Sequence, residues 1–299
     1  SIVDDNTRAV FTVSEGAIVF KGEEVDPTLH TRVFITSQNL PTYEAKELGL
    51  FKSKKDIFGW SPDLSVTVTA SEQKDYFRVV RAAALRIAEL SDIAEKTMHI
   101  THGMMRLPTG KMSSRTGDVI TGESLLNELT DAAKERAAES RADDKEKLAN
   151  DVAVAAIKFQ ILKQTSGKDI IFDRERALSL EGDSGPYLQY AHARAHQIVE
   201  KGKADGVSAQ IDLTATPNLV TRLIHRFPEV VEHASNLMEP HIVTTYLTEL
   251  ASAYNSWYAQ EQILDGTPAA AHKVAVVDAV RQTLKNGLWI LGIPAPEKM

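Results

Sequence analysis

Hydrophobic residues follow two different patterns in the two halves of this 299-residue chain. In the first half, short β-branched runs predict strands at residues 9–13, 17–20, 32–37, 64–70 and 97–105. Between them we expect a helix from Pro41 to Leu48, with Asn39 as its cap and Gly49 as its stop. A longer stretch of helical periodicity covers Lys74–Lys96.

The order of these elements predicts a parallel sheet. The first two runs form a hairpin around Ser14-Glu15-Gly16. The remaining order is strand–helix–strand–helix–strand, and crossovers of this length join parallel strands. In such sheets ligands bind beyond the carboxyl ends of the strands. Those ends lie at residues 37–43, 70–73 and 105–115, so we expect their polar side chains to converge on one edge.

The last of these polar clusters is the loop Leu107–Gly117, with the sequence LPTGKMSSRTG. Its cations are Lys111 and Arg115, and Ser113 and Ser114 are small hydroxyl donors. Such a loop suits a polyphosphate, because hydroxyls and amides donate to phosphate oxygens and a lysine stabilises the charge of departing pyrophosphate. A solvated basic turn has the same composition, so the loop alone leaves both interpretations open.

The first cluster pairs an aromatic ring with a carboxylate. Tyr43 and Glu47 are four residues apart and share one face of a helix, and Gln73 can add a neutral hydrogen bond from the second strand end. This combination suits a guanidinium, which takes a bidentate acceptor and a flat surface. The alternative is a solvated Glu47 that pairs with Lys46 or Lys55.

From Thr121 onward strand signals are scarce, and the pattern predicts an all-helical bundle. Thr121 can cap the first of its helices. Residues 151–162 are nearly all apolar and predict a buried helix. Glu181–Gly202 predicts a long helix that Asp183 or Ser184 caps and that Gly202 stops.

One face of that long helix carries two rings and a cation. Tyr187 and Tyr190 are three residues apart, and Arg194 is four residues further on. Aromatic rings stack on splayed RNA bases, and a guanidinium stacks or pairs with phosphate. An aromatic stripe that belongs to a helical core has the same spacing, so both interpretations stay open at this point.

Composition excludes several classes of function. The chain has no cysteine, which excludes disulfides and thiolate metal sites and fits a reducing cytoplasm. His192 and His196 lie four apart without a further ligand, so we expect no metal site. No apolar run is long enough to span a bilayer. The net charge is −7, with 20 basic and 25 acidic residues up to residue 151 and 14 and 16 after it. Any RNA contact must therefore come from a local patch and stacking.

Four segments together resemble arginyl-tRNA synthetase, a class I enzyme: TSQNLPTYEAKELGL, TVTASEQKDYF, HITHGMMRLPTGKMSSRTG and EGDSGPYLQYAHARAHQIVEKG. The resemblance covers almost the whole chain and keeps the order of the motifs. It implies an α/β plus all-α fold. Residues 1–122 would be the second half of a parallel, Rossmann-like catalytic domain with a β-hairpin insertion at its start, and residues 123–299 a helical-bundle anticodon-binding domain.

The activity that this resemblance implies is arginine–tRNA ligation. Arginine would be activated by ATP to arginyl-adenylate and transferred to tRNA(Arg). The expected partners are therefore arginine, tRNA(Arg) and ATP with Mg²⁺ as substrate, with no metal bound by the protein itself. The resemblance also leads us to expect a cytoplasmic monomer that makes no contact with membranes.

The resemblance also assigns roles to residues of the first half. Tyr43, Glu47 and Gln73 fall where the family recognises the arginine side chain, although the family more often has aspartate at the position of Glu47. The loop residues Lys111, Ser113 and Ser114 would steady the ATP phosphates during catalysis. Near the adenine pocket the family match places Gly103 and Met104.

In the second half the matching positions are those that meet the anticodon loop. Tyr187, Tyr190 and Arg194 fall on such positions. Tyr254 and Tyr258 share a face of a further helix and belong to the same surface. The chain ends PAPEKM, like the family, which makes Met299 a candidate contact to tRNA.

One departure from the family is large. Class I synthetases carry a His-x-Gly-His signature in the first half of their catalytic fold, and this sequence has no such string. The N-terminal extension of the family has no counterpart either. We therefore expect the C-terminal portion of a longer protein, weakly active or inactive alone. The alternative is a non-catalytic tRNA-binding module. A sister enzyme for cysteine ranks last, because its usual zinc site needs cysteines.

Overall fold

The computed structural model describes residues 2–58, 62–108, 121–138, 140 and 142–299, which form two compact units. The first unit comprises residues 1–104 with 166–168, and the second comprises residues 105–165 with 169–299. The domain boundary that the sequence suggests at residue 122 stays a prediction. Among the described residues, no helix is both long enough and apolar enough to cross a membrane.

The first unit mixes strands and helices. Its elements are α1 (Ile2–Asp5), β1 (Thr12–Ser14), β2 (Ala17–Phe20), β3 (Arg32–Ile35), α2 (Tyr43–Phe58), β4 (Ser65–Ala70), α3 (Lys74–Ala84), α4 (Ser91–Glu95) and β5 (Thr97–His102), with single 3-10 turns at Gly22–Glu24 and Ser71–Gln73. The predicted hairpin is confirmed: β1 and β2 pair antiparallel, and Glu15 and Gly16 in its turn have φ of 49° and 79°.

The parallel sheet is smaller than the sequence predicts. β4 and β5 pair in parallel, with Ala70 opposite His102 at their carboxyl ends, as expected. β3, however, pairs antiparallel with β2 and joins the hairpin instead. This pairing brings the rings of Phe11, Phe20 and Phe34 together, with centroids 4.9 to 6.3 Å apart. The burial of this aromatic cluster explains why β3 takes the hairpin as its partner.

Two helix predictions for the first unit were wrong in their bounds. α2 runs through Gly49, because Leu48 and Phe51 on either side of it are buried in the same core. Asn39 has a positive φ of 60° in the preceding turn and does not cap the helix. The stretch predicted as one helix over residues 74–96 breaks into α3 and α4.

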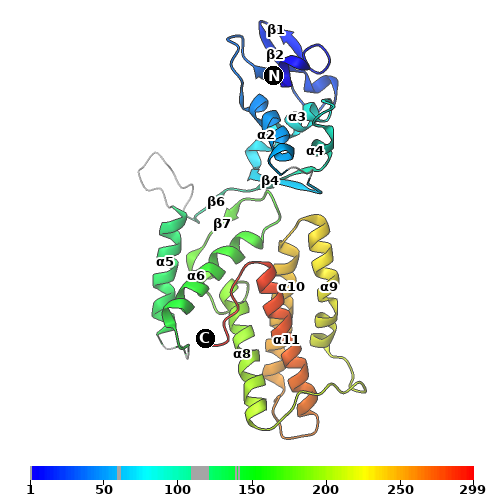
Figure 1. Cartoon of the computed structure of the whole chain (residues 1–299). Helices are drawn as coiled ribbons and strands as arrows, with labels where there is room; N and C mark the ends of the chain where they lie inside the picture. The colour runs from blue at the N-terminus through cyan, green and yellow to red at the C-terminus, as the bar shows by residue number, and fades with distance from the viewer. Residues whose placement is uncertain (1, 59–61, 109–120, 139, 141) are drawn as a thin grey trace. The chain divides into compact units, whose positions relative to one another are not determined.

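The second unit is built from helices and one short sheet. Its elements are β6 (Met105–Arg106), α5 (Gly122–Ala137), α6 (Lys145–Leu162), β7 (Ile170–Ile171), α7 (Arg174–Ala177), α8 (Gly185–Ala204), α9 (Leu219–Leu237), α10 (His241–Gln260) and α11 (Ala270–Ile290). Figure 1 shows α8, α9, α10 and α11 as a bundle, with α5 packed against α6. β6 and β7 pair in parallel.

Capping in this unit follows the sequence closely. The side chain of Thr121 accepts a hydrogen bond from the amide of Ser124 and caps α5. Of the two candidates for α8, Ser184 is the cap, since its hydroxyl accepts from the amide of Tyr187. α8 continues past Gly202, which was the predicted stop, and ends at Ala204.

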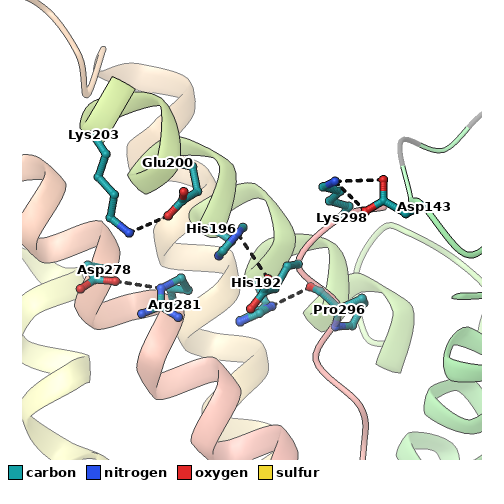
Figure 2. Close-up of polar contacts among 10 residues, drawn as sticks. Asp143, His192, His196, Glu200, Lys203, Asp278, Arg281, Pro296 and Lys298 are labelled. Carbon is teal, nitrogen blue, oxygen red and sulfur yellow. Dashed lines mark hydrogen bonds and ion pairs between the residues drawn. The ribbon is translucent and has the colours of Figure 1, made fainter. Parts of the chain in front are cut away.

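The segment after α11 runs back along α8 and is held there by side chains (Figure 2). Gln189 donates from Nε2 to the carbonyl of Pro294, 2.8 Å away. His192 lies 2.8 Å from the carbonyl of Pro296 through Nδ1, which must donate because a carbonyl oxygen only accepts. Further along, the carboxylate of Glu297 lies 3.7 Å from His196, and Lys298 pairs with Asp143 at 2.8 Å.

This arrangement makes stability depend on pH through His192. Burial lowers the pKa of His192 from its ordinary 6.5 to about 4, assisted by the nearby Arg281 and opposed by the hydrogen bond to Pro296. The folded protein therefore keeps the ring neutral, whereas the unfolded chain binds a proton as the pH falls below 6.5. The free energy of unfolding should decrease between pH 6.5 and 4, by up to about 3 kcal/mol from this group.

His192→Asn tests this dependence, because its amide can still donate to Pro296 but does not titrate. Urea denaturation at pH 7 and at pH 4.5 should show a smaller loss of stability for this variant than for the unmodified chain. The exposed His225 on α9 provides a control, and His225→Asn should keep the original profile. An unchanged profile for His192→Asn would exclude the buried ring as its source.

Candidate functional site

The first polar cluster of the chain lies where α2 and α3 begin. Tyr43 starts α2 with its side chain 78% exposed, and Glu47 follows one turn later and is half-buried. Gln73 ends the 3-10 turn directly before α3, and Tyr76 lies in the first turn of that helix. The two helix starts touch, since the hydroxyl of Tyr76 donates to the backbone carbonyl of Tyr43 at 3.1 Å.

Glu47 is the carboxylate of this cluster that remains available to a ligand. Burial raises its pKa, and the charge of Lys54 partly offsets that effect. Lys46, a suggested partner, lies instead over the ring of Tyr43 at 5.4 Å. The side chain of Lys55, the other suggested partner, lies outside the described residues. Glu47 has no ion-pair partner among the side chains that the structure describes. A half-buried carboxylate of this kind favours a cationic ligand.

Tyr76 and Arg32 complete this cluster, and neither was predicted from the sequence. Burial raises the pKa of Tyr76, and the nearby charges of Glu47 and Glu44 raise it further. The guanidinium of Arg32 lies 5.6 Å from the centre of the Tyr76 ring and pairs with Glu44 at 3.0 Å. Glu44 thus has an ion-pair partner, whereas Glu47 has none within the described part of the chain. The spacing of three residues from Gln73 was the signal that could have identified Tyr76.

The carboxyl ends of β4 and β5 bring two predicted site segments together. The register places Ala70 beside His102, so Gln73 and Gly103 follow neighbouring strand ends. Gly103 is buried and Met104 is exposed. The loop residues Lys111, Ser113 and Ser114 lie outside the described residues. The structure therefore places Gln73 and Gly103 at neighbouring strand ends. The convergence of the loop residues with them stays a prediction.

The second unit carries a separate cluster around Arg194 that joins α8 to α10. The guanidinium carbon of Arg194 lies 4.5 Å from the ring centre of Tyr190 and 5.4 Å from that of Tyr258. Its Nη1 donates to the side-chain oxygen of Asn255 at 2.8 Å, and the amide nitrogen of Asn255 donates to the hydroxyl of Tyr187 at 3.0 Å. We call these five residues the Arg194 cluster.

The Arg194 cluster is partly open to solvent. Tyr187, Tyr190 and Arg194 are half-buried, and Tyr258 is 41% exposed. Because these residues are partly exposed, they are not an aromatic stripe sealed inside the helical core. A cation held among partly exposed rings offers stacking surfaces together with donors for oxygen atoms, which suits single-stranded nucleic acid. Asn255, which links the two helices, was missed because an isolated asparagine in a helix gives no signal in the sequence.

Two predicted RNA-binding residues lie elsewhere. Tyr254 is 0% exposed in the helical core, with its ring centre 6.4 Å from that of Tyr258. It therefore packs against the Arg194 cluster from the core side. A direct contact of Tyr254 with RNA would require the core to open. Met299 packs against the apolar cluster between α5 and α6. The segment leading to it contacts Gln189 and His192, and helical geometry places these two residues about 140° to 160° around α8 from Tyr187 and Arg194.

No metal site emerges from the described residues, which contain no group of three histidine, aspartate or glutamate side chains able to hold an ion. His192 and His196, the pair with metal-like spacing, face the C-terminal segment. Their spacing reflects two contacts with that segment.

Comparisons with protein families match both parts of the chain. The model of the class I tRNA synthetase (R) catalytic domain matches residues 1–174, and the model of the DALR anticodon binding domain matches residues 188–299. These matches confirm the predicted family resemblance and the predicted fold, a class I catalytic part followed by a helical anticodon-binding part.

Individual relatives agree with the family models. The arginine–tRNA ligase of Pyrococcus abyssi is 34% identical over 261 residues, which cover 83% of this chain and 41% of that protein. The ligase of Halothermothrix orenii is 36% identical over 245 residues, or 79% of this chain and 42% of that protein. The structure of Thermus thermophilus arginyl-tRNA synthetase matches with a TM-score of 0.85 and 29% identity, over 100% of this chain and 57% of that one. The chain thus spans about half the length of these relatives.

The buried hydroxyl beneath the Arg194 cluster gives a prediction about stability. The hydroxyl of Tyr254 is buried without a hydrogen-bond partner among the described residues, an arrangement that costs about 1–3 kcal/mol. Tyr254→Phe should therefore leave the stability unchanged or raise it by about 1 kcal/mol in urea denaturation.

Tyr246 on the same helix is the matched control, because its hydroxyl donates to the carbonyl of Leu223 at 2.8 Å. Tyr246→Phe should lower the stability by about 1 kcal/mol. Equal losses in the two variants would show that Tyr254 has a partner after all.

Proposed function

Because the chain belongs to the family of class I tRNA synthetases for arginine, we propose that it forms part of an arginine–tRNA ligase. The observation that carries the proposal is the half-buried carboxylate of Glu47, which has no ion-pair partner among the described side chains and lies beside two tyrosines at the starts of α2 and α3. Such a site suits the side chain of arginine. The cluster around Arg194, within the part that matches an anticodon-binding family, supplies a surface for RNA.

In this proposal Glu47 accepts hydrogen bonds from the guanidinium of the substrate arginine, which two parallel N–H groups can make to one carboxylate. The exposed ring of Tyr43 offers a flat face beside it, and Gln73 adds a neutral hydrogen bond. This arrangement selects a planar cation. A lysine ammonium is a point charge and cannot donate two parallel hydrogen bonds to the two carboxylate oxygens of Glu47.

ATP is the second substrate in the proposal, accompanied by Mg²⁺. Gly103 and Met104 follow the end of β5 and are proposed to contact the adenine. The arginine carboxylate attacks the α-phosphate, which forms arginyl-adenylate and releases pyrophosphate. Lys111, Ser113 and Ser114 are proposed to stabilise the charge on the departing phosphates. A ribose hydroxyl of tRNA then attacks the arginyl carbonyl, and AMP leaves.

The proposed tRNA surface is the Arg194 cluster. Tyr190 and Tyr258 stack on bases of the anticodon loop, while Arg194 donates to oxygens of a base edge or a phosphate. Met299 stays a proposed contact with a different part of the RNA, since it lies on the other side of α8. The proposal further includes a cytoplasmic location and a monomeric state.

A second candidate function is a tRNA-binding module without catalysis. The observation in its favour is that residues 188–299 by themselves match an anticodon-binding family, and RNA binding does not require the catalytic part. Arginine-dependent pyrophosphate exchange, measured in the presence of tRNA, separates the two functions. The measurement uses an extended chain that restores the segment which the relatives carry. Exchange supports the ligase, and its absence together with intact tRNA binding supports the module.

Glu47→Gln tests the arginine site in that extended chain. The substitution removes the negative charge but keeps the shape, so arginine binding should weaken by about 1.5–3 kcal/mol, or roughly 10- to 150-fold. Binding of tRNA should stay within about twofold. Isothermal titration with arginine and filter binding with tRNA measure the two effects. Equal losses for both ligands would remove Glu47 from the arginine pocket.

Tyr190→Ala tests the RNA surface in the chain as it stands. One stacked base is worth about 1–3 kcal/mol, so affinity for a stem–loop RNA with an arginine anticodon should fall about 5- to 150-fold. Because Tyr190 is half-buried, the melting temperature should change little. Trp289, which is exposed on α11, provides an aromatic control. If Trp289→Ala weakens binding as much as Tyr190→Ala does, the proposed surface is wrong.

A further inference from the structure

A polar hollow of about 760 Å³ lies in the second unit, apart from the Arg194 cluster. It is enclosed by the end of α6, by β7 and α7, by the turn before α8 and by the first half of α10. The residues on which its chemistry depends are Gln160, Lys163, Asp169, Asp173, Arg176 and Asp183.

The carboxylates of this hollow are already engaged within the protein. Asp183 pairs with Lys163 at 3.0 Å, and Asp169 pairs with Arg106 at 2.7 Å. Asp173 caps α7 by accepting from the backbone amide of Arg176 at 3.1 Å. The hollow therefore has little capacity left for a cationic ligand, although it contains three acids.

Its donors, by contrast, are partly unused. The side-chain nitrogen of Gln160 is buried without a hydrogen-bond partner among the described residues, and the whole residue is only 3% exposed. The guanidinium of Arg176 is exposed and has no ion-pair partner in the part of the chain that the structure describes. The ammonium of Lys163 is fixed by Asp183 and lies 5.9 Å from the ring centre of Phe159. Unused donors beside a fixed cation favour a ligand rich in acceptor oxygens.

The position of the hollow connects it to the RNA surface. Thr248 lines it from α10, and Asn255 of the Arg194 cluster follows seven residues later on the same face of that helix. The rise of a helix makes this separation about 10 Å. The hollow and the Arg194 cluster follow each other in the same way along α8. Asp183, which lines the hollow, lies just before the helix, and Tyr187 of the Arg194 cluster lies in its first turn. A strand bound at the Arg194 cluster that follows the two helices toward the start of α8 reaches the hollow.

We propose that this hollow binds the sugar–phosphate backbone of the RNA whose bases stack on the Arg194 cluster. Arg176 and Lys163 lie against phosphate, and the amide of Gln160 donates to an oxygen at the floor. The inference rests on the proposed function, because it requires RNA at the Arg194 cluster. It adds a contact that depends on the backbone and not on the sequence of the loop.

The test compares two arginines of the same short helix. Arg176 lines the hollow, whereas Arg174 pairs with Glu128 at 2.8 Å and does not line it. Arg176→Gln should weaken binding of the stem–loop RNA about 3- to 10-fold at low salt. It should also reduce the slope of log affinity against log salt by about 0.7, the value for one phosphate contact of a single strand. Arg174→Gln should leave both quantities unchanged.

Gln160→Met gives a second readout that a structural role would not produce. Removal of an amide whose buried nitrogen has no partner among the described residues should keep or raise the melting temperature of the free protein, while RNA affinity falls. A loss of affinity in Arg176→Gln that is equal for a stem–loop with a scrambled loop supports a backbone contact. A loss confined to the arginine anticodon overturns it.

The remaining outcomes separate the inference from the function on which it rests. If Tyr190→Ala weakens RNA binding but Arg176→Gln leaves affinity and salt slope unchanged, the hollow is not an RNA subsite and the proposed surface stands. If the RNA does not bind even the unmodified chain, the proposed function itself fails. The last experiment measures the melting temperature of the protein with and without inorganic phosphate. A phosphate-induced rise in melting temperature that Arg176→Gln abolishes, with an unchanged RNA salt slope, would identify a site for free phosphate and overturn the proposal.

Discussion

The second unit depends on the close approach of α8 to α6. A Cβ atom at Gly185 would lie 2.2 Å from the backbone oxygen of Ala155, so only glycine allows the two backbones to touch at this point. The contact fixes the rotation of α8 about its axis. Gln189, one turn later, donates to the carbonyl of Asp151 on α6 at 3.1 Å. With that face committed to α6 and to the C-terminal segment, the opposite face carries Tyr190 toward solvent.

The same contact sets the polar hollow. Asp183 stands just before Gly185, and its distance to Lys163, the residue directly after α6, follows from how closely the two helices pack. Gln160 lies on the same stretch of α6. One glycine thus positions two features that the sequence places far apart. In the first unit the corresponding contact is a hydrogen bond, in which the hydroxyl of Tyr76 joins the starts of α2 and α3. Glu47 lies beside this contact and is only partly buried.

Local chemistry explains which parts of this structure the sequence predicts. The hairpin turn at Glu15-Gly16, the caps at Thr121 and Ser184 and the parallel pairing of β4 with β5 all follow from residues close in sequence. The partner of β3 does not, because it depends on three phenylalanine rings that meet only in the folded state. The stripe of Tyr187, Tyr190 and Arg194 follows from helical spacing. Asn255, which holds two of those residues, becomes visible only when α8 and α10 are side by side.

The way Arg194 is held has an entropic consequence. A free arginine side chain carries about 2 kcal/mol of rotamer entropy, which a ligand must otherwise overcome when it fixes the side chain. Here two rings and an amide restrict the guanidinium within the folded protein, so most of that ordering has taken place during folding. In the proposed function, a nucleotide would therefore meet a rigid donor and not a mobile one. The interaction therefore discriminates by geometry, since a misplaced oxygen cannot draw the side chain toward itself.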